Sequence, residues 1–191
     1  LKISPNDKII ALENHRGALI IVDIAKQTKI LVAKTAVGRL GGFNWSRDSK
    51  WLAFGIEDDS YNGSIQLYAL SNKKTTKITE GTFLDTEPCF SYCGNYLYFL
   101  SNRIFNPVYD SVYFDLNFPQ SQKPFCVVLN KTAINPFIPQ KKSFEEKKIN
   151  GTYKAINATN INLDGIEQRI IAMPIKEGIY HNLCCTPESV L

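Results

Sequence analysis

A short phrase built around serine returns three times along the chain and constrains the fold more than any other feature. The copies begin at Ser4, Ser46 and Ser91, and each passes through a polar turn into an apolar run. The intervals between them are 42 and 45 residues, the length in which four short strands and their turns form one blade of a β-propeller. The repeat therefore predicts an all-β chain in which each copy marks one blade.

Three strands are expected after each serine at matching positions, so the repeat extends beyond the phrase. Their ranges are Ile9–Glu13, Ala18–Ile24 and Thr28–Val32, then Trp51–Ile56, Ser64–Leu70 and Thr75–Thr79, then Tyr96–Ser101, Ser111–Phe118 and Pro124–Leu129. Several of them are apolar on both faces, as expected for a blade that is buried between two neighbours. An inner strand precedes the second and third turns, at Phe43 and Phe90, and is expected to be missing ahead of Ser4.

The chain is therefore expected to be one partial propeller domain over residues 1–191. Four-stranded antiparallel blades are expected near residues 1–34, 40–79 and 84–130, and the start of a fourth blade near 160–191. Residues 131–158 are predicted to form an exposed insertion loop, because they hold a proline-rich turn and the charged run 141–148.

Composition and charge argue against several classes of partner. Of the 191 residues, 44% are hydrophobic and 21% charged, which suits a folded core. The net charge of +4, without a basic face interleaved with aromatic residues, predicts no nucleic-acid partner. No apolar stretch is long enough to span a bilayer, and the first five residues lack the apolar run of a signal peptide. We therefore expect no membrane partner, and cysteines that form neither a complete disulfide framework nor a zinc site fit a cytoplasmic protein with reduced thiols best.

Residues able to carry chemistry are few, and no catalytic, cofactor-binding or metal site is predicted. A hydrolytic triad needs a base beside its nucleophile, and only His15 and His181 are available, without a Gly-x-Ser-x-Gly turn to present a serine. Five cysteines lack the paired spacing of a zinc site, and packed, reduced thiols are the favoured interpretation even for Cys89 and Cys93, which flank one turn. The other three are Cys126, Cys184 and Cys185.

A pair of carboxylates ahead of the third inner strand is the most tempting polar group. Asp85 and Glu87 precede Pro88 at one end of the propeller, near the central channel, where they could meet a ligand. Equally, Asp85 could bond the amides of its turn while Pro88 fixes the entry to the strand. Arg103 could pair with such a carboxylate or face the channel, and the residues alone leave both alternatives open.

Several longer phrases are more specific than the serine turns. They are Tyr96–Arg103, Phe105–Asp110, Phe114–Pro119, Leu163–Arg169 and Pro174–Tyr180. In this order, over residues from about 85 to 180, the phrases resemble the seven-bladed propeller of the tricorn protease family. The serine turns by themselves are shared with TolB-type and peptidase propellers, and the asparagine- and lysine-rich insertion departs from the family pattern.

The resemblance implies a propeller segment of a large cytoplasmic serine peptidase, a hydrolase that assembles as a ring of six subunits. Such enzymes degrade oligopeptides released by the proteasome or similar proteases, and the seven-bladed propeller is thought to filter or guide those peptides. None of the family's catalytic residues has a matching position in this chain. We therefore expect the segment itself to be non-catalytic and its partners to be oligopeptides and further copies of the full-length protein.

Two alternatives remain open from the sequence. The chain could be a TolB-type or WD-repeat scaffold that binds proteins without any attached enzyme. It could also be the propeller of a prolyl-oligopeptidase-like enzyme, in which a Gly-x-Ser-x-Gly turn would follow downstream.

Overall fold

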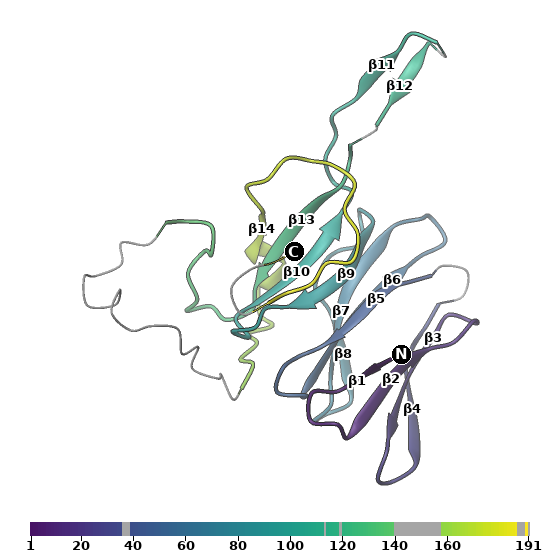
Figure 1. Ribbon diagram of the computed structural model, residues 1–191, viewed down its shortest axis with the longest axis vertical. Helices are drawn as coiled ribbons and strands as arrows, with labels where there is room; N and C mark the ends of the chain where they lie inside the picture. Colours follow the sequence, from purple (N-terminus) through teal and green to yellow (C-terminus); the bar gives the residue numbers. More distant parts are fainter. Residues whose placement is uncertain (36–38, 113, 119, 140–157, 187–189, 191) are drawn as a thin grey trace.

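The computed structural model describes residues 1–35, 39–112, 114–118, 120–139, 158–186 and 190. The strands in this part of the chain form three four-stranded antiparallel sheets, side by side, and a separate two-stranded hairpin that projects away from them (Figure 1). The predicted all-β fold of four-stranded propeller blades is confirmed. Among the described residues, no helix is long and apolar enough to cross a membrane.

Each sheet runs from an inner to an outer strand. The first holds β1 (Lys2–Ile3), β2 (Ile9–Glu13), β3 (Ala18–Asp23) and β4 (Thr28–Lys34). The second holds β5 (Leu40–Trp45), β6 (Trp51–Glu57), β7 (Gly63–Ala69) and β8 (Lys74–Lys77). The third holds β9 (Asp85–Phe90), β10 (Tyr96–Ser101), β13 (Lys123–Val128) and β14 (Ile170–Ala172). The hairpin consists of β11 (Val108–Asp110) and β12 (Asp115–Asn117), and a short 3-10 helix, η2 (Ile166–Arg169), precedes β14.

The serine phrase has the same geometry in all three copies. The hydroxyl of Ser46 is buried and accepts the amide of Trp51 at 2.9 Å, while the Ser46 amide donates to the Trp51 carbonyl at 2.9 Å. Ser4 makes the equivalent pair of bonds with Ile9, and Ser91 makes it with Tyr96. The turn is closed by a residue with positive φ, Asp7, Ser49 or Gly94. A small or turn-forming residue is needed there because the left-handed region strains most side chains.

The second sheet is buried on both faces, as its sequence predicts. In β6, Leu52 and Phe54 pack into a core shared with the first sheet, whereas Ala53 packs into a core shared with the third. The sheets approach closely at Gly63, where a Cβ atom would lie 2.9 Å from the carbonyl oxygen of Asp85. Because successive side chains of a strand point to opposite faces of the sheet, one strand contributes to two different cores, one on each side of its blade.

One expectation for the first blade is wrong. An inner strand was expected to be missing ahead of Ser4, but β1 occupies that place and pairs with β2, with Lys2 opposite Ala11 and Ile3 opposite Ile10. Two residues suffice because the serine turn that follows them fixes the register.

The third blade departs from the predicted ranges. Ser111–Phe118 was expected to be its third strand, yet that segment belongs to the β11–β12 hairpin, and β13 pairs with β10 over six residues instead. The blade closes with β14, which pairs with β13, so residues 170–172 do not open the next blade. The repeat interval could not reveal this, because the insertions before β13 and β14 displace both strands without changing their type. The charged run 141–148 lies outside the described residues.

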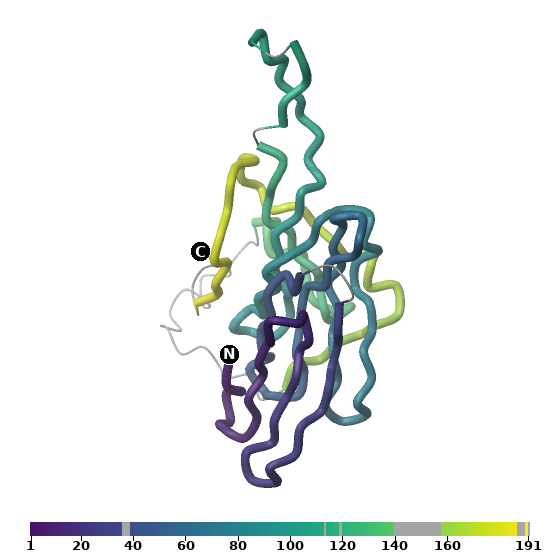
Figure 2. Tube along the Cα trace, turned by 90° about the vertical axis from the view of Figure 1, so that its right-hand side faces the viewer, coloured from purple at the N-terminus to yellow at the C-terminus, as the bar shows by residue number. Residues whose placement is uncertain are grey.

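Residues 173–186 then run along the side of the third sheet that faces away from the second sheet (Figures 1 and 2). Gly178 donates its amide to Gln122 at 2.9 Å, and Cys185 forms an isolated bridge with Val190. An apolar cavity of about 230 Å³ lies beneath this segment, lined on the sheet side by Leu100 and Pro124. The segment therefore covers a face that alternation along β10 leaves apolar.

Candidate ligand-facing surface

The inner strands of the sheets line an open cavity of about 410 Å³. Its lining comes from β1, β5, β9 and the segment after β14, and consists of Lys2, Leu40, Gly41, Gly42, Phe43, Thr86, Glu87, Pro88, Asn182 and Leu183. Four stretches far apart in sequence therefore build one wall, at the place where a propeller has its central channel. We call this space the inner cavity.

Two backbone irregularities shape the inner cavity. The pairing of β5 with β6 shifts register around Gly42, whose φ is +85°, and the pairing of β9 with β10 shifts next to Glu87, whose φ is +52°. Such bulges interrupt a ladder and are frequent beside binding sites. A Cβ atom at Gly41 would lie 2.8 Å from the Thr86 side chain, so only glycine lets the two inner strands approach this closely.

Charge in the inner cavity is sparse and of both signs. Lys2 supplies an exposed ammonium group, and the Glu87 carboxylate accepts the amide of Leu183 at 2.9 Å. An extended peptide carries unpaired backbone amides and carbonyls, which such groups and exposed strand edges bind weakly and without sequence preference. Among the described residues, Lys2 and Glu87 are the only charged side chains that line the inner cavity.

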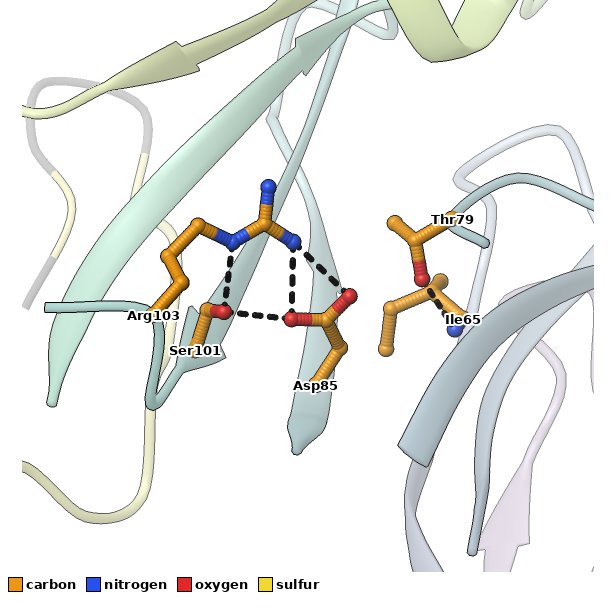
Figure 3. Close-up of polar contacts among 5 residues, drawn as sticks. All are labelled: Ile65, Thr79, Asp85, Ser101 and Arg103. Atoms are coloured by element: carbon orange, nitrogen blue, oxygen red, sulfur yellow. Dashed lines mark hydrogen bonds and ion pairs between the residues drawn. The ribbon is translucent and has the colours of Figure 1, made fainter. Parts of the chain in front are cut away.

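A second polar cluster lies where β9 begins and β10 ends (Figure 3). The Arg103 Nη2 atom donates to both oxygens of Asp85, at 2.8 and 2.9 Å, and its Nε donates to the Ser101 hydroxyl at 2.7 Å. That hydroxyl donates in turn to Asp85 at 2.5 Å. Asp85 is 1% and Ser101 0% exposed, while the Arg103 side chain is 18% exposed, so the three groups satisfy one another at a largely buried site.

Aromatic rings enclose the guanidinium of this cluster. The Arg103 Cζ atom lies 4.7 Å from the ring centre of Phe125, 5.1 Å from Phe83 and 5.5 Å from Phe99. The cluster stands at the foot of the projecting hairpin, where Ile104 donates its amide to the carbonyl of Ser121. It also borders a cavity of about 370 Å³. The Asp85 carboxylate beside Ser101 is paired with Arg103, so the cluster holds the end of β10 and the base of the hairpin in place.

The sequence left the roles of Asp85 and Arg103 open, and the structure decides them. Arg103 pairs with the Asp85 carboxylate, which therefore lies in the ion pair and does not face a ligand. Glu87 lies apart from it in the inner cavity, so the two carboxylates do not act as one pair. His15, in a hairpin turn of the first sheet, and His181 are both exposed.

The cysteines are all free thiols, and their surroundings differ. Burial raises the pKa of Cys126 to about 12. Cys93 lies 3.3 Å from the Ser91 hydroxyl and does not pair with Cys89, whose neighbour is Cys185. Within the described ranges, no three His, Cys, Asp or Glu side chains are placed to hold a metal ion.

Sequence reasoning missed the wall that residues 182 and 183 contribute to the inner cavity. A signal was present, because Thr186-Pro187-Glu188-Ser189 resembles the serine phrase Ser4-Pro5-Asn6-Asp7. The residues just before that phrase form the inner strand in every earlier copy. The long insertions in the third blade stretch the interval from Ser91 to Thr186 to 95 residues and hide the fourth copy from a search at blade spacing.

Comparison with known proteins agrees with this architecture. The sequence model of the tricorn protease second β-propeller domain matches residues 1–191. Tricorn protease homolog 1 of Streptomyces coelicolor is 28% identical over an alignment 195 residues long, which covers 100% of this chain and 18% of that protein. The tricorn protease homolog of Saccharolobus solfataricus is 31% identical over 180 residues, which are 94% of this chain and 16% of that protein.

The fold is also that of a solved relative. The crystal structure of the tricorn protease aligns with 96% of this chain and 18% of its own, with a TM-score of 0.77 and 22% identity. The chain thus spans less than a fifth of each of these relatives. It belongs to the tricorn protease family, within the second β-propeller domain.

Proposed function

We propose that this propeller segment guides or filters oligopeptides on their way to a serine-peptidase site elsewhere in the full-length protein, and is itself non-catalytic. The inner cavity is the observation that carries the proposal, because four inner segments converge on it with few charges and with bulged strands. Rigid, closely packed walls select a passing chain by its width, while sparse polar groups avoid trapping it. Peptides left by the proteasome or similar proteases in the cytoplasm are the substrates proposed.

The test narrows the inner cavity in the full-length protein. Lys2→Trp adds bulk at the wall, whereas Lys8→Trp makes the same change at an exposed turn outside it. We expect Lys2→Trp to lower kcat/KM for peptides of ten or more residues by about 3–10-fold and to leave a short reporter peptide unaffected, because only the long chain must thread. If the ratio of kcat/KM for the long peptides to kcat/KM for the short reporter peptide were the same in Lys2→Trp and Lys8→Trp, the guiding role would be contradicted.

The non-catalytic role of the segment has its own test. The chain of residues 1–191 should show no cleavage of fluorogenic peptides, whereas the full-length protein should cleave them. Serine-peptidase inhibitors should abolish the latter activity. Inhibitor-sensitive cleavage by the purified segment would overturn this part of the proposal.

The proposed partner of the full-length protein is a further copy of itself, and the projecting hairpin is the surface that supports this. Six apolar side chains between residues 105 and 116 are more than half exposed: Phe105, Val108, Tyr109, Val112, Phe114 and Leu116. A two-stranded hairpin is only marginally stable in water, so burial against another subunit would both cover these side chains and fix the ribbon.

Sedimentation of the full-length protein tests this assembly. The double variant Tyr109→Ser with Leu116→Ser should dissociate the oligomer at micromolar concentration, because it removes apolar area from both hairpin strands. Leu31→Ser, at a side chain of similar exposure on β4, is the matched control and should leave the oligomer intact. An unchanged oligomer in the hairpin variant would rule out the hairpin as the contact.

A further inference from the structure

Two cysteines that are 96 residues apart in sequence meet next to the inner cavity, since Cys89 follows Pro88 and Cys185 stands two residues after Leu183, and both of these residues line that cavity. The Cys185 thiol donates to the carbonyl oxygen of Cys89 at 3.9 Å, and the Cys89 thiol donates to the carbonyl oxygen of Phe90 at 3.8 Å. The two thiols lie close enough to shift each other's pKa. Cys89 is on β9 and is 5% exposed, while Cys185 is half-buried in the segment that follows β14.

The segment that carries Cys185 is held along its length. Tyr180 donates its amide to the Gln122 side chain at 2.7 Å, and Leu183 donates its amide to the Glu87 carboxylate at 2.9 Å. These two bonds tie the chain to the third blade just before Cys185. The contact between the thiols is therefore a fixed feature of the local backbone path.

A corresponding contact joins the inner strands of the second and third blades. There, the Asn44 side chain accepts the amide of Phe90 at 3.2 Å. Asn44 stands two residues before Ser46 and Cys89 two before Ser91, whereas Phe90 and Cys185 each stand one residue before the phrase that follows. The thiol pair thus takes the place of a polar contact between successive inner strands.

We propose that Cys89 and Cys185 are a redox pair that forms a reversible disulfide, fixing the segment 178–186 to β9 and locking one wall of the inner cavity. The oxidant is hydrogen peroxide, which the burial of Cys89 admits in preference to bulky disulfide reagents. The Cys89 thiolate attacks one peroxide oxygen and becomes a sulfenic acid, releasing one water once a proton is taken up. The Cys185 sulfur then displaces the hydroxyl as a second water, its own proton leaving with it, and a thiol reductant restores both thiols.

The surroundings favour Cys89 as the attacking group. The nearby Cys185 thiol, then the Cys185 backbone and then the charge of Lys2 lower the pKa of Cys89 despite its burial. The same contact and burial raise the pKa of Cys185. The neighbouring Cys126 has its pKa raised by burial and is a poor competitor for peroxide.

Mass spectrometry of the 191-residue chain after mild peroxide treatment tests the pairing. Trypsin leaves Cys89 with Cys93 and Cys184 with Cys185 on shared peptides, so the assay uses the double variant Cys93→Ser with Cys184→Ser, which keeps the proposed pair. We expect a linked peptide of residues 78–103 and 177–191 that dithiothreitol separates. Cys185→Ala and Cys89→Ser, each added to the double variant, should abolish it, and Cys126→Ser should not.

A stability measurement guards against misfolded variants. Closing a loop of this length should raise the Tm of the oxidised double variant by about 5–10 °C, reversibly with reductant. The amides of Tyr180 and Leu183 should exchange with solvent more slowly in the oxidised form. No linked peptide, a link that persists without Cys89 or Cys185, or a link between two molecules would overturn the proposal. These readouts need no peptide cleavage, so they are independent of the guiding role.

Discussion

The Nη2 atom of Arg103 donates to both oxygens of the Asp85 carboxylate, at 2.8 and 2.9 Å, and this ion pair lies at the junction of β9, β10 and the projecting hairpin. Asp85 begins the inner strand and Arg103 follows the end of its neighbour, so the pair fixes two chain directions at once. The ion pair also fixes the point at which the chain leaves the regular blade and enters the hairpin.

Removing one member of this pair should destabilise the chain strongly. Asp85→Ala leaves the guanidinium without its charge partner among three aromatic rings, and we expect a loss of about 3 kcal/mol in the free energy of unfolding. The double variant Asp85→Ala with Arg103→Met should lose less, because no buried charge remains. Urea unfolding measures both. A double variant that loses as much stability as Asp85→Ala alone, or more, would contradict the coupling.

Gly63 should not tolerate a methyl group. Gly63→Ala would place a Cβ atom 2.9 Å from the Asp85 carbonyl oxygen, which is backbone and cannot move aside cheaply. We expect a loss of about 1–3 kcal/mol by thermal unfolding, since the second and third sheets must separate locally. Gly178→Ala is the matched control, because its nearest new contact is an ordinary 3.4 Å to Tyr180. Equal stability of the two variants would argue against close packing of the sheets.

The serine turns should each contribute measurably to stability. Ser46→Ala removes a buried acceptor for the Trp51 amide and a donor to Asp48 at 2.6 Å, and we expect a loss of about 1–2 kcal/mol. Ser60→Ala, at an exposed serine in the neighbouring loop, should change stability by less than about 0.5 kcal/mol. Chemical denaturation compares them, and a neutral Ser46→Ala would show that the turn forms without its hydroxyl.

Cys126 should make stability fall at alkaline pH. Burial raises the pKa of its thiol from 9.0 to about 12, so the folded state favours the protonated form. This contribution is complete below the ordinary pKa and is lost as the pH rises through the window from 9.0 to about 12. Unfolding at several pH values in this window should show a shallower decline in Cys126→Ala than in the parent chain. Parallel declines would mean that other groups cause the loss.

The regular blades were predictable because their information is local. A serine, a turn residue able to adopt positive φ and an apolar strand recur together, and each serine hydroxyl bonds within its own phrase. The first and second sheets therefore follow the expected strands closely. The third does not, because the hairpin after Arg103 and the insertion before Ile170 lengthen connections without altering the strands they join.

Residues of the candidate site were harder to predict than the strands. Glu87 and Lys2 meet only because separate blades place their inner strands around one cavity, and the contact of Cys89 with Cys185 spans 96 residues. Of the alternatives that the sequence left open, the structure shows Arg103 paired with a carboxylate, and it shows Asp85 in that ion pair and not beside Glu87 in the inner cavity.

The amino-acid sequence by itself determined the β-propeller architecture and, through its longer phrases, the family. Such patterns are set by backbone conformation and strand alternation, which act over a few residues. Only the tertiary structure decided which strand closes the third blade, how Asp85 is used and which thiols meet. Those outcomes depend on contacts between blades, and the repeat in the sequence does not show which residues of different blades lie close together.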